Sequence, residues 1–276
     1  MKKSDNGVLK VLMIGNSFCY YFTDELYGML KAAGIEAVIA DVYFSGCSLF
    51  RHVRDYKEKI NEFEFYVTDR NGRRKEKDVG LAHCLDADDW DIISIQNHFY
   101  PNLTADFAGA AEVTSVNAPE LVKIVRSHKP DARLYWHETW AFQVGYDRND
   151  GQIATVEAQT RQYEAIRDIS RTVAENMHLP VVPSGDAWQM ARADPLIGDV
   201  LCTDATRNEG LGDNYHDGDI GGGQYLNACV WFEILTGQSP EGNPFTPDYS
   251  LPREKMAREQ SVAHKAVTAE KERAQR

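Results

Sequence analysis

The chain has 276 residues, and 30 Lys and Arg against 42 Asp and Glu give it a formal net charge of −12. This acidic balance argues against nucleic acid or an anionic membrane surface as a partner, because both attract basic proteins. With 43% hydrophobic and 26% charged residues, the composition is that of a globular protein and not of a disordered one. No apolar run approaches the ~20 residues of a membrane span.

The five cysteines are widely and irregularly spaced, and no two form a Cys-x-x-Cys pair. The sequence therefore indicates no zinc ribbon, redox motif or disulfide framework. Lys10 interrupts the first apolar stretch and no cleavage site follows it, so we interpret this stretch as a strand and not as an export signal. We expect a cytoplasmic protein, with a trimmed secreted form as the alternative that the sequence leaves open.

Five short stretches rich in Val, Ile and Leu recur along the chain, with helix-type stretches between them. Their weak alternation is typical of strands buried on both faces of a parallel sheet. Alternating strands and helices predict a three-layer, doubly wound α/β fold of the flavodoxin-like type, with a mainly parallel five-stranded sheet. The predicted strands are Val8–Ile14, Glu36–Phe44, Asp91–Ile95, Ala132–Trp136 and Pro180–Val182.

Helix signals fall between these strands and after the last of them. Thr23 is the predicted N-cap of the first long helix and Gly34 its stop. Apolar residues recur at helical spacing from Gln152 to Met177. A later helix is predicted to open near Asp219 and to continue through Asn227–Leu235.

One segment departs from the alternation of strands and helices. Phe63–Thr68, followed by Asn71-Gly72 and a charged run, predicts a small β-hairpin insertion over about residues 63–78. We interpret its basic cluster, Arg70–Lys77, as a solvated hairpin tip, because Glu76 interrupts the positive charge.

The C-terminal segment, residues 251–276, is rich in Lys, Glu, Arg and Ala. Because it shows little periodic apolar content, we expect a solvated helix that frays. The sequence therefore predicts a single domain over residues 1–250, followed by a charged helical tail.

In an open α/β sheet, ligands bind outside the carboxyl ends of the strands, so polar residues at those positions are the candidates for chemistry. Gly15-Asn16-Ser17-Phe18 follows the first predicted strand, and Gly46 follows the second. Gln96-Asn97-His98 follows the third, and Asp213-Asn214-Tyr215-His216 stands before the last core helix. These residue types converge on one edge of the predicted sheet.

This ordered set resembles the blocks of the SGNH, or GDSL-type, serine hydrolases over roughly Val8 to Gly237. Gly15-Asn16-Ser17-Phe18 is similar to the first block, in a variant with Asn where the family usually has Asp. Gly46 matches the glycine block and Asp213-x-x-His216 the last block. The third block is usually Gly-x-Asn-Asp, whereas here it reads Gln96-Asn97-His98, so either Asn97 or Gln96 could supply its amide.

The resemblance implies the SGNH hydrolase fold and an esterase with a triad of Ser17, His216 and Asp213. A serine hydroxyl is a weak nucleophile without an adjacent base, and an imidazole accepts and returns protons near neutral pH. The aspartate would hold the imidazole in the required tautomer. No metal or organic cofactor is implied.

The resemblance also implies an oxyanion hole, formed by the backbone N–H groups of Ser17 and Gly46 and by the side-chain amide of Asn97, with Gln96 as the alternative. The predicted substrate-pocket residues are Phe18, His98, Trp140 and Tyr215. Because His98 and His137 have no third ligand at metal spacing, we interpret them as pocket-wall or hydrogen-bonded polar residues.

The leading substrate class implied by the resemblance is O-acetyl groups on a carbohydrate, with lipid esters and thioesters behind it. Aromatic residues near the strand ends could stack on sugar rings, but core packing explains them equally well. The alternative function is a catalytically silent glycan-binding module on the same fold, which the altered third block favours. The expected partner is thus a small-molecule or glycan ester, and the oligomeric state stays open.

Overall fold

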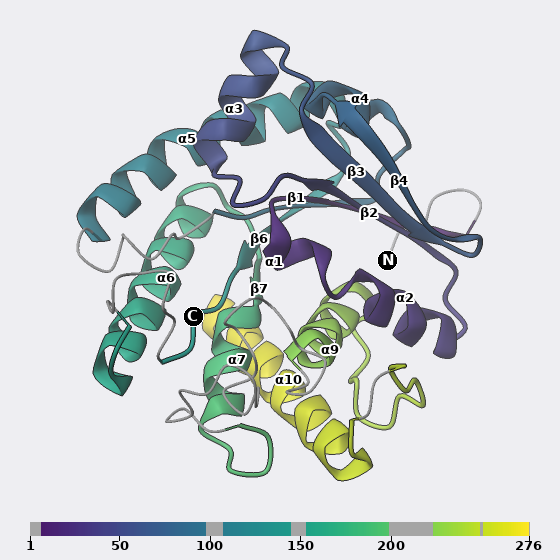
Figure 1. Ribbon diagram of the computed structural model, residues 1–276, viewed down its shortest axis with the longest axis vertical. Coiled ribbons are helices and arrows are strands. Elements are labelled where there is room, and N and C mark those ends of the chain that lie inside the picture. The colour runs from purple at the N-terminus through teal and green to yellow at the C-terminus, as the bar shows by residue number, and fades with distance from the viewer. Residues whose placement is uncertain (1–6, 98–106, 145–152, 199–222, 249–250, 276) are drawn as a thin grey trace.

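Seven strands pair into one mixed sheet in the computed structural model, which describes residues 7–97, 107–144, 153–198, 223–248 and 251–275 (Figure 1). The strand order is β4-β3-β2-β1-β5-β6-β7. The strands are β1 (Leu9–Ile14), β2 (Ala37–Tyr43), β3 (Phe63–Asp69), β4 (Gly72–Val79), β5 (Ile92–Ile95), β6 (Arg133–Glu138) and β7 (Val181–Pro183). From β2 to β7 all neighbours are parallel, in the doubly wound order that the sequence predicts.

Helices cover both faces of this sheet, which confirms the predicted three-layer α/β fold (Figure 1). One face packs against α1 (Ser17–Tyr20), α2 (Thr23–Ala32), α7 (Ser184–Arg192), α9 (Gly223–Thr236) and α10 (Arg253–Ala274). The other face packs against α3 (Leu49–Glu58), α4 (Leu81–Asp86), α5 (Phe107–His128) and α6 (Val156–Asn176). None of the helices in the described ranges has the length and hydropathy needed to cross a membrane.

The central strand β1 illustrates why the apolar runs form strands. Leu9, Val11 and Met13 enter the core beneath α2 and α9, whereas Leu12 and Ile14 enter the core beneath α3 and α5. Successive side chains of a strand point to opposite faces, so a strand covered on both sides needs an almost continuous apolar run. The observed strand boundaries lie within two residues of the predicted ones.

The first long helix, α2, ends as predicted but begins differently. Gly34 follows it with φ +72°, the left-handed conformation that suits glycine. Thr23 is the first helical residue and not the N-cap, which is Phe22. The Thr23 hydroxyl instead donates to the carbonyl of Tyr20, 3.3 Å away.

The predicted hairpin forms, but it extends the main sheet. β3 pairs antiparallel with β2, and β4 pairs with β3 through the turn at Gly72, where φ is +93°. The expectation of a solvated tip is wrong for Arg73, whose side chain is only 24% exposed. Its guanidinium lies 4.1 Å from the ring centre of Tyr20 and donates to Asp24, so it fixes the hairpin against α1 and α2.

The C-terminal helix also corrects a prediction. α10 packs against α7, α9 and β7 instead of lying in solvent, and it contributes buried side chains to the core. The buried apolar residues are Met256, Val262, Ala263, Ala266 and Val267. Alanine and valine at helical spacing form a narrow apolar stripe on one side of α10. The sequence prediction missed this stripe because charged residues surround it and alanine is only weakly hydrophobic.

Asp41 on β2 is a buried carboxyl group beneath α1, with 1% of its surface exposed. Neither of its oxygens has a hydrogen-bond partner among the described residues. Burial raises the pKa of Asp41 from 3.8 to about 8, against the opposing effect of Arg73 and with support from Asp24 and Glu64. The folded chain therefore keeps a proton on this group that the unfolded chain loses near pH 4.

This raised pKa predicts that the contribution of Asp41 to the free energy of unfolding falls as pH rises from about 4 to 8 and levels off above pH 8. The slope from one such group is at most about 1.4 kcal/mol per pH unit. In the Asp41→Asn variant this decline should be absent. Urea denaturation at several pH values measures it, and Asp89→Asn, at a 97% exposed side chain, is the control. Equal slopes for Asp41→Asn and wild type would contradict the prediction.

Candidate active site

The carboxyl ends of the parallel strands lie at one level of the sheet edge. Ile14 at the end of β1 pairs with Val42 on β2 and with Ile95 at the end of β5. Ile95 pairs in turn with Trp136 on β6. The polar segments that follow β1, β2 and β5 therefore begin side by side, as the sequence predicts for these segments.

Ser17 is the first residue of α1, the short helix that follows β1 (Figure 1), and it is half-buried. The preceding Asn16 is the N-cap, and its extended backbone turns the chain from β1 into the short helix. The other two predicted triad residues, Asp213 and His216, lie outside the described residues, as do His98 and Tyr215. The triad therefore stays a prediction.

Asn16 is fully buried and joins the three segments that surround Ser17. Its Oδ1 accepts hydrogen bonds from the backbone N–H of Phe18 (3.0 Å) and from Nε2 of Gln96 (2.8 Å). Its Nδ2 donates to the carbonyl of Cys47, 3.0 Å away. A side-chain amide both accepts and donates, whereas an ionised carboxylate only accepts, so Asn16 suits this position where an aspartate would face the Cys47 carbonyl without a donor.

Two further contacts hold the β1–α1 loop from behind. A Cβ atom on Gly15 would lie 2.6 Å from Cδ of Gln96, so glycine lets the Gln96 side chain lie against the backbone. Nε2 of the buried His52 lies 3.0 Å from the Gly15 carbonyl, which can only accept a hydrogen bond. Burial lowers the pKa of His52 to about 4, so the ring is neutral at pH 7 and carries its hydrogen on Nε2. Sequence reasoning missed His52, because it lies 37 residues from its partner.

The predicted oxyanion-hole residues Gly46 and Asn97 follow β2 and β5. Gly46 is exposed and adopts φ +62°, a left-handed turn for which glycine is suited. Asn97 is buried, and its Oδ1 accepts from the backbone N–H of Leu49 (3.4 Å) while its Nδ2 donates to Oγ1 of Thr114 (2.6 Å). This anchors the Asn97 amide to α3 and α5 and leaves it one further N–H.

Gln96, the alternative donor, has both ends of its amide engaged in the interior. Its Nε2 donates to Asn16, and its Oε1 lies 2.9 Å from Nδ1 of His137. His137 is itself fully buried, and its Nε2 lies 3.0 Å from the hydroxyl of Ser184. The interpretation of His137 as a hydrogen-bonded polar residue is therefore confirmed, and the contacts of Gln96 fit a supporting role better than contact with substrate.

Two of the predicted substrate-pocket residues pack in the core instead. Phe18 is 2% exposed and Trp140 is 4% exposed. Their rings lie 4.6 Å apart, and Trp140 stacks on Trp188 with a centroid distance of 4.3 Å. Core packing thus explains these aromatic side chains, and the structure does not support a role for them in sugar stacking.

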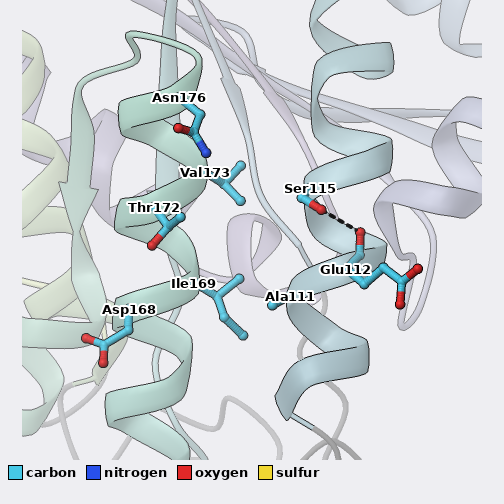
Figure 2. A pocket seen from close by; sticks show the side chains of 8 residues that line it. All are labelled: Ala111, Glu112, Ser115, Asp168, Ile169, Thr172, Val173 and Asn176. Carbon is cyan, nitrogen blue, oxygen red and sulfur yellow. Dashed lines mark hydrogen bonds between the residues drawn. The ribbon is translucent and has the colours of Figure 1, made fainter.

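A separate cavity of about 340 Å³ lies between α5 and α6 (Figure 2). In its lining, the hydroxyl of Ser115 donates a hydrogen bond to the carbonyl of Glu112 on the same helix, α5, 2.8 Å away. The lining residues are Ala111, Glu112, Ser115, Asp168, Ile169, Thr172, Val173 and Asn176. This cavity includes none of the predicted site residues, and its lining pairs no nucleophile with a base.

The sequence matches one protein family over most of its length. A family described as "Domain of unknown function (DUF4886)" matches residues 10–268. The chain belongs to this family. The solved structure of a DUF4886 family protein from Bacteroides uniformis is similar to it, with 27% sequence identity, 95% of both chains covered and a TM-score of 0.75.

A second solved structure places the DUF4886 chain in a wider fold group. This is the structure of a protein from Parabacteroides merdae that is described as a GDSL-like lipase, and it compares with this chain at a TM-score of 0.51 and 17% sequence identity. The match covers 83% of this chain and 95% of that chain. At this identity the likeness shows the fold alone, and it confirms the SGNH hydrolase fold that the sequence motifs imply. Among proteins with curated functions, none matches the sequence.

The contacts of Asn16 predict that Asn16→Asp, which restores the usual spelling of the first block, destabilises this chain. The new carboxylate would face the Cys47 carbonyl without a donor, so the free energy of unfolding should fall by about 1–3 kcal/mol. Thermal and urea denaturation measure the loss. Asn71→Asp, at the exposed hairpin turn, is the matched control and should change stability little. An unchanged midpoint for Asn16→Asp would contradict the role given to the Asn16 amide.

Proposed function

We propose that this DUF4886 protein is a serine esterase that hydrolyses carboxylic esters through an acyl-enzyme intermediate on Ser17. The observation that carries the proposal is the hydrogen bonding around Asn16, which joins the Ser17 loop to the Gly46–Cys47 segment and to the end of β5. One side chain thereby joins the loop of Ser17, which would supply the nucleophile and one oxyanion donor, to the segment of Gly46, which would supply a second donor. The SGNH fold of the chain supports the same activity.

In this mechanism, Oγ of Ser17 attacks the ester carbonyl while His216 accepts the hydroxyl proton. Asp213 stabilises the resulting imidazolium. The negative oxygen accepts hydrogen bonds from the N–H groups of Ser17 and Gly46 and from the Asn97 amide. When the tetrahedral intermediate collapses, the carbon–oxygen bond to the alcohol breaks and His216 returns the proton to the alcohol. Water activated by His216 then releases the acid.

The proposed substrate class is O-acetyl groups on a carbohydrate. The resemblance of the motif set supports it. The half-buried tyrosines beside α1 add no separate support, because Tyr20 packs against Tyr43 and Tyr66, with ring centres 4.9 and 4.5 Å away, and Arg73 lies over the Tyr20 ring.

The test is hydrolysis of p-nitrophenyl acetate by wild type and by Ser17→Ala, with fluorophosphonate labelling of both. Loss of the nucleophile should lower kcat by at least about 10³-fold and abolish labelling. Ser115→Ala, which removes a hydroxyl bonded within α5, should hydrolyse as wild type does.

Equal rates for wild type and Ser17→Ala would end the esterase proposal. Binding of acetylated sugars without turnover would instead identify the glycan-binding module. A panel of acetylated sugars and of p-nitrophenyl esters of increasing acyl length then separates a carbohydrate acetylesterase from a lipase or thioesterase.

A further inference from the structure

A chain of buried polar side chains runs from α9 to the nucleophile loop, across three neighbouring strands of the sheet. Its members in order are Asn227, Ser184, His137, Gln96 and Asn16, and each is at most 2% exposed. The successive contacts measure 2.5, 3.0, 2.9 and 2.8 Å. Ser184 follows β7, which lies three strands away from β1, so the chain connects the far side of the sheet to the loop that carries Ser17.

The direction of every hydrogen bond in this chain follows from its nucleophile end. The Phe18 N–H can only donate and the Cys47 carbonyl can only accept, so Asn16 must present Oδ1 to the first and Nδ2 to the second. Gln96 must then donate to Oδ1 through its Nε2, which leaves its Oε1 facing His137. His137 therefore carries a hydrogen on Nδ1.

The second nitrogen of His137 settles the rest of the chain. Burial lowers the pKa of His137 to about 3, so the ring is neutral and Nε2 is a hydrogen-bond acceptor. The Ser184 hydroxyl therefore donates to Nε2, and its oxygen is left to accept. Oδ1 of Asn227 lies next to Ser184 Oγ, while Nδ2 has no partner among the described residues. Turning this amide by 180° lets its N–H donate to Ser184 and gives all five side chains consistent roles.

We propose that Ser184 and His137 are positioning residues for the ester hydrolysis proposed above, on which this inference rests. Through Gln96 they hold the Asn16 amide in the one orientation that binds both Phe18 N–H and the Cys47 carbonyl. If His137 carried its hydrogen on Nε2, Gln96 would have to turn, and its oxygen would face Oδ1 of Asn16. The Ser17 and Gly46 segments, which supply the nucleophile and oxyanion donors, would then lose their common anchor.

The decisive variant is Gln96→Glu, because its hydrogen bonding depends on pH. A protonated glutamic acid donates to Asn16 and accepts from His137, as the amide does, whereas the ionised carboxylate only accepts. The ratio of its kcat to that of wild type should fall at least tenfold between pH 5 and pH 9, with KM within a factor of two. Gln96→Met has no group that donates, so its ratio should be low and independent of pH. Circular dichroism at each pH verifies that the variants stay folded.

A second test uses the far end of the chain. Ser184→Ala removes the donor to His137 Nε2 and should lower kcat about tenfold without changing KM. Ser170→Ala is its matched control, because Ser170 is equally buried and its hydroxyl has no partner among the described residues. Nitrogen-15 NMR of labelled histidine should show the Nδ1–H tautomer for His137 in wild type and loss of this single form in Ser184→Ala.

The outcomes separate this inference from the proposed function. If wild type shows Ser17-dependent turnover but the Gln96→Glu ratio is flat with pH, or the His137 spectrum shows the Nε2–H form, the positioning role is overturned and the esterase stands. If wild type shows no Ser17-dependent turnover, the esterase proposal fails and the positioning role fails with it.

Discussion

The geometry of the candidate site depends on the Asn16 amide and its three hydrogen bonds. One small side chain, buried between β1, β2 and β5, satisfies a backbone donor, a backbone acceptor and a neighbouring amide at once. A buried polar group without partners is costly, so each of these bonds constrains the others. The loop that carries Ser17 is thereby positioned by the interior of the protein, and not only by the strand that precedes it.

The sheet supplies the framework for this arrangement. Parallel strands in doubly wound order bring residues that are distant in the sequence to the same edge, and the helices seal both faces. The interior behind that edge is unusually polar: His52, Gln96, His137 and Ser184 are all buried there. Both histidines are neutral because burial disfavours their charged forms, so they act as fixed donors and acceptors and not as proton-transfer groups.

Much of the fold could be predicted because its signals are local. The apolar runs of β1 and β5 and the Asn71-Gly72 turn identify strands and hairpin without tertiary information. The shared edge at which the segments of Ser17, Gly46 and Asn97 begin follows from topology alone. The partners of Asn16 did not, because Gln96 lies 80 residues away, and the next links are separated by 41, 47 and 43 residues. The same limit applies to Phe18 and Trp140, since an aromatic residue at a strand end fits a pocket and a core equally well.

The position of α10 has a consequence for how the protein is made. This 22-residue helix is the last of the described elements in chain order, yet it packs against β7, α7 and α9 (Figure 1). During synthesis, every strand of the sheet emerges from the ribosome before this helix does, so the apolar surface that α10 covers stays exposed until α10 itself has been made. That layer of the core can therefore be completed only after α10 has emerged, and a nascent chain that still lacks α10 presents a surface on which chaperones can act.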